Sequence, residues 1–289
     1  MHALLEFAHR CCLYLGVPKS GQAWEPRFLK REPLFALFEP IASQLRGDEW
    51  PTLEMYAEVG ERRRLAHVPD LPKLSFAAAP KKPRRFKRER VILDELYDSR
   101  IALRGEVPCL MHSYHDLLNA IVFAAFPRGK RLLHQRQYAA ITRWVPPDAM
   151  QLPGRRTREQ DALTIFDEGG VVLLMTNAHY SSWLSQTEPL SIEPANPNSG
   201  VLPVLFGHAL LEHLHDGHQA LRATGIVLPV PEILSGEELL VQVDSQLSER
   251  LAAPASFQRP DADSVFERGA DGAITIRAPK QESRASGDA

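Results

Sequence analysis

The stretch Ser113 to Lys130 reads SYHDLLNAIVFAAFPRGK and is apolar for most of its length. Ser113 is a favourable N-cap and Pro127 lacks a backbone donor, so the pattern predicts a helix from about Tyr114 to Phe126. A second helix is predicted from about Lys130 to Trp144. Two helices joined by so short a turn pack as neighbours, so this stretch predicts a helix built for burial beside a second one.

Three polar residues, His115, Asp116 and Asn119, interrupt the first two turns of this helix. His115 and Asn119 are four residues apart and share a helix face, whereas Asp116 points about 100 degrees away. Ser113 and Asp116 form an S-x-x-D pattern, so Asp116 fits either a capping box or a metal ligand. His115 and Asn119 fit either a hydrogen-bonded core pair or a catalytic pair, in which His115 is a general base and Asn119 orients the substrate.

The composition is that of a soluble globular protein. The chain has 289 residues, of which 44% are hydrophobic and 24% charged, and 34 basic residues nearly balance 36 acidic ones. No global field therefore attracts nucleic acid or anionic lipid. The apolar runs are shorter than the roughly 18 residues of a membrane span, so no integral membrane segment is expected. Three cysteines form no disulfide framework, and the N-terminus lacks the pattern of a secretory signal, which together favour the cytoplasm.

The remaining signals predict further helices, a β-hairpin and one additional strand. The helices are expected at residues 3–15, 51–64, 177–186, 201–217 and 237–251. Leu163–Asp167 and Val171–Met175 flank Gly169 and Gly170 and are expected to form the hairpin, with a helix as the competing interpretation. The segment GIVLPVP, residues 225–231, is expected to be a short edge strand limited by its prolines. The predicted fold class is α+β, a mainly helical single domain with a β-hairpin and a short extra strand.

Two segments differ in composition from the rest of the chain. Residues 253–289 contain few large apolar side chains, so we expect a globular domain over residues 1–252 followed by a mostly disordered tail. Seven of the ten residues from 81 to 90 are basic, which fits either a solvated connector or a contact with nucleic acid or an acidic partner. These seven residues are Lys81, Lys82, Arg84, Arg85, Lys87, Arg88 and Arg90.

Candidate metal ligands lie in two later segments. His208 and Glu212 are four residues apart on one predicted helix face, a spacing that fits either a divalent metal site or an ion pair. Asp167 and its neighbour Glu168 fit either ligands or turn formers, and we favour the turn for Glu168. Asp161 and Asp167 lie on one face of the predicted strand, so Asp161 is a further catalytic candidate. The metal candidates are thus His208, Glu212, Asp167 and Asp116.

Four motifs resemble a known family. They are YDSRIALRGEVP (residues 97–108), YHDLLNAIVFAAFPRGK (114–130), DALTIFDEGG (161–170) and FGHALLEHL (206–214). In this order they resemble the bacterial family catalogued as Domain of Unknown Function 3025. The resemblance implies no activity, but it indicates which polar positions matter most. These positions are His115, Asp116, Asn119, Lys130, Asp161, Thr164, Asp167, Glu168, His208 and Glu212.

Common catalytic motifs are absent, since the sequence contains no G-x-S-x-G, no Walker A loop, no G-x-G-x-x-G and no H-E-x-x-H. Two hypotheses remain. In the first, the motif residues surround a small polar pocket that binds a small molecule or a divalent metal for hydrolysis. In the second, the protein is a non-catalytic binding protein that acts through the basic residues 81–90, and the motif residues are structural. The sequence alone leaves open whether the protein is an enzyme.

Overall fold

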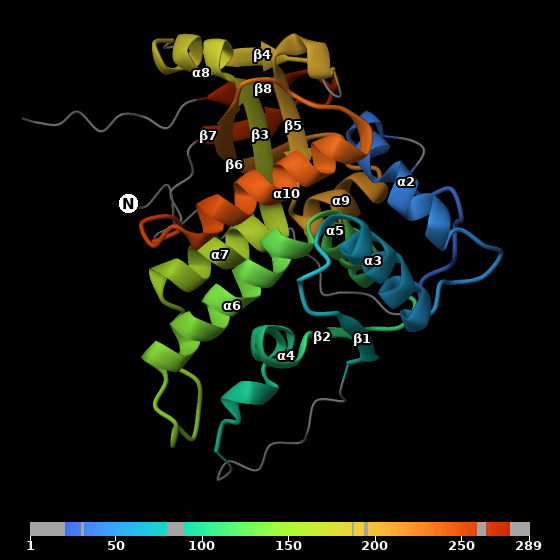
Figure 1. Ribbon diagram of the computed structural model, residues 1–289, viewed down its shortest axis with the longest axis vertical. Coiled ribbons are helices and arrows are strands. Elements are labelled where there is room, and N and C mark those ends of the chain that lie inside the picture. Colours follow the sequence, from blue (N-terminus) through green and yellow to red (C-terminus); the bar gives the residue numbers. More distant parts are fainter. Residues whose placement is uncertain are drawn as a thin grey trace, which may run out of the picture.

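The computed structural model describes residues 21–29, 32–79, 90–186, 188–193, 196–258 and 264–277 (Figure 1). Its α-helices are α2 (Glu39–Ala42), α3 (Leu53–His67), α4 (Tyr97–Arg104), α5 (Tyr114–Ala125), α6 (Pro127–Trp144), α7 (Arg158–Gly169), α8 (Asn177–Leu184), α9 (His208–His215) and α10 (Gly236–Ala252). Short 3-10 helices are η1 (Pro33–Phe38), η2 (Ser43–Leu45), η3 (Leu93–Glu95) and η4 (Pro197–Ser199). The strands are β1 (Ser75–Ala78), β2 (Glu106–Cys109), β3 (Gly170–Thr176), β4 (Leu190–Ile192), β5 (Val201–Leu205), β6 (Leu221–Val230), β7 (Ser264–Arg268) and β8 (Ile274–Arg277).

A six-stranded mixed sheet has the strand order β4-β8-β7-β6-β3-β5. β3 and β6 run parallel, and the other neighbouring strands run antiparallel. The residues from Val171 to Met175 in β3 are completely buried, which explains their continuous apolar run. α10 packs against β3 and crosses in front of the sheet in Figure 1. A small parallel sheet of β1 and β2 lies beside α4. The helices and the mixed sheet confirm the predicted α+β class.

The two helices of the opening stretch are confirmed as α5 and α6. Every residue of α5 except His115 is buried, and the Ser113 hydroxyl accepts a hydrogen bond from the Asp116 amide at its start. α6 begins at Pro127 without a cap from its own N-cap side chain. Instead, the Asp244 carboxylate of α10 accepts from the first amide groups of α6, those of Arg128 and Gly129, at 3.1 and 2.8 Å. A residue 115 positions away thus caps the second helix.

The predicted hairpin at residues 163–175 is wrong in its first half. Residues 163–167 belong to α7, the competing interpretation, whereas the second predicted strand is present as β3. Thr157 and Gln160 form a complete capping box that starts α7, and Leu163 and Phe166 are buried at helical spacing. Gly170 then donates to the Phe166 carbonyl and closes the helix, so the glycines mark a helix end rather than a hairpin turn.

Two other expectations change around the sheet. The helix expected over residues 201–217 is divided into β5 and α9. The segment 225–231 was expected to be a short edge strand, but β6 has ten residues and lies between β3 and β7. β7 pairs only with residues 221–225 of β6. Pro229 therefore lies where β7 no longer requires a backbone donor, and this explains how an interior strand contains a proline.

The tail expected to be disordered contains two strands in its described part. β7 and β8 form an antiparallel hairpin that joins the main sheet between β6 and β4. Phe266, Ile274 and Ile276 are buried there, and their alternation is hidden by the low average hydrophobicity of the segment. The disorder prediction is therefore wrong for residues 264–277. Residues 259–263 and 278–289 lie outside the described ranges.

Three other predicted helices are confirmed as α3, α8 and α10. The helix predicted at residues 3–15 and the basic residues 81–88 lie outside the described residues. Arg90 is described and is exposed. Among the described residues, no helix combines the length and apolarity that crossing a membrane requires.

Candidate metal centre

His115 faces helix α9 from the first turn of α5. Its Nδ1 lies 2.8 Å from the Glu212 carboxylate, which fixes the orientation of the imidazole ring. The side chain retains 15% of its exposure, so it lies at the edge of the core rather than inside it. His115 is the one residue of α5 that is not buried, and its side chain lies where this helix meets α9.

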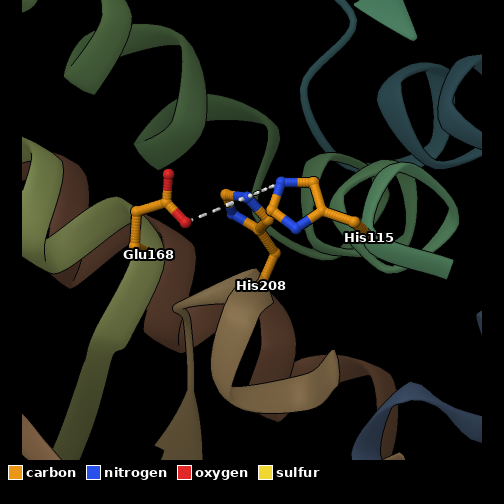
Figure 2. Close-up of side chains that lie close together, drawn as sticks. All are labelled: His115, Glu168 and His208. Carbon is orange, nitrogen blue, oxygen red and sulfur yellow. Dashed lines mark hydrogen bonds and ion pairs between the residues drawn. The ribbon is translucent and has the colours of Figure 1, made fainter. Parts of the chain in front are cut away.

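His208 is the first residue of α9, and its Nε2 lies 3.1 Å from His115 Nε2 (Figure 2). Its Nδ1 lies 2.9 Å from the backbone carbonyl oxygen of Asp167. The two rings are nearly perpendicular, with centroids 4.5 Å apart. Each histidine therefore has one ring nitrogen held by the protein and directs the other nitrogen toward the same point.

A close backbone approach brings His208 next to the end of α7. The amide groups of Phe206 and Gly207 both donate to the Gly170 carbonyl, at 3.0 and 2.8 Å. A Cβ atom at Gly207 would lie 2.5 Å from the Glu168 carbonyl oxygen, so only glycine fits between the two segments. The backbone between β5 and α9 therefore packs directly against the backbone between α7 and β3.

Glu168 completes the cluster from the last turn of α7. One of its carboxylate oxygens lies 3.7 Å from His208 Nε2 (Figure 2). Ligand atoms of His115, Glu168 and His208 all lie within 4.8 Å of one another, an arrangement that can hold a metal ion. We call these three residues the His–Glu–His cluster.

The hydrogen bonds of the two histidines determine where their hydrogens lie. The Asp167 carbonyl only accepts, so Nδ1 of His208 carries a hydrogen. Nδ1 of His115 faces the Glu212 carboxylate and carries a hydrogen for the same reason. In the neutral rings each Nε2 then bears a lone pair, and the two lone pairs face each other across 3.1 Å. A cation between the nitrogens, either a metal ion or a shared proton, makes this contact favourable.

The charges around the cluster shift the pKa values of its members. Burial, followed by the charge of Lys130, holds the pKa of His208 well below its usual range. Burial also disfavours charge on His115, but the hydrogen bond and charge of Glu212 outweigh it and raise the pKa of that ring. Burial and the charge of Asp167 raise the pKa of Glu168 to about 7. The His208 ring is therefore neutral in the folded protein at neutral pH.

Two of the predicted metal ligands have other partners. The Asp167 carboxylate lies 2.5 Å from Nζ of Lys130, which is completely buried. Burial favours the neutral acid, but Lys130 overcomes it and lowers the pKa of Asp167 below its usual range. The Asp116 carboxylate accepts from the Leu110 amide at 3.1 Å, and burial raises its pKa. Asp167 contributes its carbonyl to the cluster rather than its carboxylate.

The other sequence-predicted residues are placed at varying distances from the cluster. Glu212 adjoins the cluster through its bond to His115. Asn119 bonds to the Tyr97 hydroxyl at 2.9 Å. Asp161 lies in the first turn of α7, seven residues before Glu168, so about 10 Å of helix separates them. The structure thus brings His115, His208 and Glu212 together. Asn119 and Asp161 lie outside the His–Glu–His cluster.

Glu168 is the functional candidate that the sequence reasoning assigned to a turn. The signal that identifies it is the Thr157–Gln160 capping box. A helix started there extends to Gly169 and presents Glu168 as a helical side chain at the end of a buried element. The hairpin interpretation placed the same residue at an exposed loop tip.

Comparison with known proteins identifies a family but no characterised relative. Residues 85–262 match the model of the family described as "Protein of unknown function (DUF3025)". No curated protein and no solved structure matches the chain. The matched segment spans more than half of the chain and includes the whole His–Glu–His cluster. The chain therefore belongs to the family described as "Protein of unknown function (DUF3025)", as its four motifs predicted.

Proposed function

We propose that His115, Glu168 and His208 bind one divalent metal ion and that the protein is a metal-dependent hydrolase. The observation that carries this proposal is the pair of Nε2 atoms 3.1 Å apart, each on a ring whose Nδ1 faces an acceptor. Ligating histidines commonly donate their other ring N–H to a carboxylate or a backbone carbonyl. Both kinds of partner occur here, in Glu212 and Asp167.

The distances fit a shared ion after a small adjustment. Metal–nitrogen bonds of about 2.0–2.1 Å to atoms 3.1 Å apart give an angle of about 100 degrees at the metal, close to tetrahedral or octahedral geometry. The three ligand atoms lie within 4.8 Å of one another, and two such bonds can span at most about 4.1 Å. Glu168 retains 28% of its side-chain exposure, so it is the ligand best able to move inward.

The donor set favours a catalytic metal over a structural one. Structural zinc sites use four protein ligands, whereas hydrolytic zinc sites use three, often two histidines and a glutamate, and leave a position for water. The metal would lower the pKa of this water to about 7 and supply hydroxide at neutral pH. The chain would orient the ligands, with Glu212 holding His115 and the Asp167 carbonyl holding His208. The exposed edges of His115 and Glu168 give substrate access to the cluster.

The experiment combines metal binding with catalysis. Purified protein is stripped with chelator and reloaded with Zn²⁺, Mn²⁺, Fe²⁺ or Mg²⁺, and its melting temperature is measured. The stabilising metal form is then assayed on a panel of carboxylic esters, amides and phosphate esters. We expect metal-dependent hydrolysis that is lost in Glu168→Gln and His208→Ala. His213→Ala, on the same helix α9, is the matched control and retains activity.

Two results would contradict the proposal. The first is an unchanged melting temperature with every metal, since a ligand that binds the folded state must stabilise it. The second is hydrolysis by Glu168→Gln and His208→Ala at the rate of the unmodified protein. Binding of nucleic acid through residues 81–90 remains a prediction of the second hypothesis, because Lys81 to Arg88 lie outside the described residues.

A further inference from the structure

An open cleft lies on the surface where the end of α6 packs beside the start of α7 (Figure 1). Its volume is about 260 Å³, and its lining includes Arg143 and Trp144 of α6 together with Arg158 and Glu159 of α7. Arg158 lies ten residues before Glu168, so about 15 Å of helix separates it from the His–Glu–His cluster. The cleft is therefore a separate feature from the candidate metal centre.

Trp144, the last residue of α6, exposes a large aromatic surface at this cleft. The residue is 53% exposed, and within the described ranges no aromatic ring packs against its indole. The other three tryptophans, Trp24, Trp50 and Trp183, each pack against another aromatic ring. An exposed indole beside cationic side chains is a platform on which a flat ring of a ligand can stack.

The charged side chains around Trp144 are mainly arginines. The Glu159 carboxylate accepts from Arg136 at 2.6 Å and from Arg143 at 2.7 Å, so two guanidinium groups share one acid. Arg158 is exposed and forms no ion pair with any residue that the structure describes. Residues 136–161 contain five arginines, namely Arg136, Arg143, Arg155, Arg156 and Arg158, and three acids, namely Asp148, Glu159 and Asp161. This surface therefore has a net positive charge, although the whole chain has a formal charge of −2.

Positive charge also extends beyond the cleft. The Val91 amide donates to the Ala149 carbonyl at 2.9 Å, and Arg90 beside it is exposed. Ala149 follows Trp144 by five residues, so at most about 18 Å separates their Cα atoms. Arg90 is thus a further cation at this end of the molecule. A ligand with several phosphate groups can use charges inside and outside the cleft, whereas a single nucleotide cannot.

We propose that this cleft binds single-stranded nucleic acid, with one base stacked on Trp144 and adjacent phosphates paired with Arg158 and Arg143. Every base has a ring face that can stack on an aromatic side chain, and arginine matches the geometry of a phosphate group. A duplex conceals the faces of its bases and cannot stack on Trp144. The site goes beyond the proposed hydrolase function and requires no metal ion.

The test measures binding of labelled oligonucleotides to the full-length protein by fluorescence anisotropy. Chelator is present throughout, so that a metal ion at the His–Glu–His cluster does not contribute. The probes are single-stranded DNA and single-stranded RNA of about 12 nucleotides, within the range of single-strand sites, and a DNA duplex of equal length. We expect both single strands to bind, with an affinity that falls as salt is added, and the duplex to bind at least about tenfold more weakly.

Variants of two exposed residues locate the site. Trp144→Leu removes the stacking surface and is expected to weaken single-strand binding about tenfold, whereas Trp144→Phe keeps a ring and retains most of the affinity. Arg158→Gln is expected to reduce the slope of log affinity against log salt by about 0.7, the value for one phosphate contact on a single strand, and Arg158→Lys to restore it.

Matched controls come from exposed side chains of α3. Leu65→Ala changes a residue that is 56% exposed, and Arg62→Gln removes an exposed cation. Both are expected to bind single strands like the unmodified protein. Melting temperatures of all variants verify that each is folded.

Four results would overturn the proposal. They are an absence of single-strand binding at about 50 mM salt, duplex binding as tight as single-strand binding, unchanged affinity in Trp144→Leu, and displacement of the oligonucleotide by polyglutamate as effectively as by unlabelled oligonucleotide. The third result would move the interaction to other residues, such as the basic segment 81–90. The fourth would indicate an acidic protein as the partner instead.

Discussion

Two charged groups meet at the end of α7, and they differ in how completely their members are paired. Lys130 and Asp167 form a buried ion pair at 2.5 Å, with the Phe123 ring 4.6 Å from the ammonium group. The adjacent His–Glu–His cluster instead directs two ring nitrogens and a carboxylate at a common point. The opposite charges of Lys130 and Asp167 balance each other. The His–Glu–His cluster instead places several acceptors close together, and a cation between them would relieve their repulsion.

This difference in pairing distinguishes residues that stabilise the fold from residues that we propose bind a metal ion. Removal of one partner of a buried ion pair strongly destabilises the fold, because the other charge is then buried without a partner. A cluster of acceptors gives little stability without its cation and gains stability when the cation binds. Side chains that were indistinguishable as polar motif residues in the sequence therefore divide into two kinds. Substitutions in each group test this division.

The largest effect is expected for Lys130→Met. The substitution leaves the buried Asp167 carboxylate without its partner, so the free energy of unfolding in urea is expected to fall by about 3–5 kcal/mol. The double variant Lys130→Met, Asp167→Asn removes both charges and is expected to recover much of the loss. A loss below about 1 kcal/mol in the single variant, as at exposed ion pairs, would show that the pair is not the structural element described here.

Asp244 is not a member of the His–Glu–His cluster, and its carboxylate is paired with two amide groups. Its substitution therefore tests whether pairing of buried polar groups determines the stability of the fold. Asp244→Ala removes the acceptor of two amide groups of α6 and is expected to cost about 2 kcal/mol. Burial raises the pKa of Asp244 from 3.8 to about 6. Between these values the folded protein binds more protons than the unfolded chain, so the stability that Asp244 contributes falls as the pH rises. The cost of Asp244→Ala, measured in urea, should therefore be larger at pH 4 than at pH 7, and a cost that grows with pH would contradict this account.

Glu212→Gln addresses the partner that orients His115. Glutamine keeps the shape and an acceptor for His115 Nδ1 but loses the negative charge, so metal affinity is expected to fall about tenfold. The free energy of unfolding without metal should change little. Affinity is measured by competition with a coloured chelator, and Glu238→Gln on the exposed face of α10 is the control. Equal affinity in both variants would remove Glu212 from the metal centre.

The smallest effect is expected for His115→Asn in chelator. This substitution removes one of the two facing lone pairs, so the unfolding free energy should change by less than about 1 kcal/mol and can increase. The same substitution should abolish stabilisation by added metal. A loss as large as that of Lys130→Met would place His115 among the structural residues and erase the contrast between the two groups.

The local elements were largely predictable from the sequence. Capping residues, prolines and apolar spacing located α3, α5, α6, α8 and α10, since these signals act over a few residues. Periodicity failed where short apolar runs fit both a helix and a strand, as at residues 163–167. It failed again around Gly207, where β5 and α9 share one continuous apolar run. The hairpin of β7 and β8 was missed because average composition conceals a few alternating apolar residues.

The candidate site was predictable only in part. The helical spacing identified His115, His208 and Glu212, but it paired His208 with Glu212, whereas the structure pairs Glu212 with His115 across two helices. Asp167 lies 37 residues from Lys130, and no local pattern indicates that bond. Contacts of this kind depend on tertiary packing, as does the close backbone approach at Gly207 that brings His208 next to the end of α7. Most residues of the candidate site were thus predictable from the sequence, but the contacts among them were not.

The most direct test of the central claim is the metal content of the protein. Metal-free protein is dialysed to equilibrium against micromolar Zn²⁺, Mn²⁺ or Fe²⁺, the last without oxygen, and the bound metal is quantified by elemental analysis. We expect close to one ion per chain for at least one metal, loss of this ion in His115→Ala and His208→Ala, and its retention in His213→Ala. Metal far below one ion per chain for all three, or equal amounts in all four proteins, would contradict it.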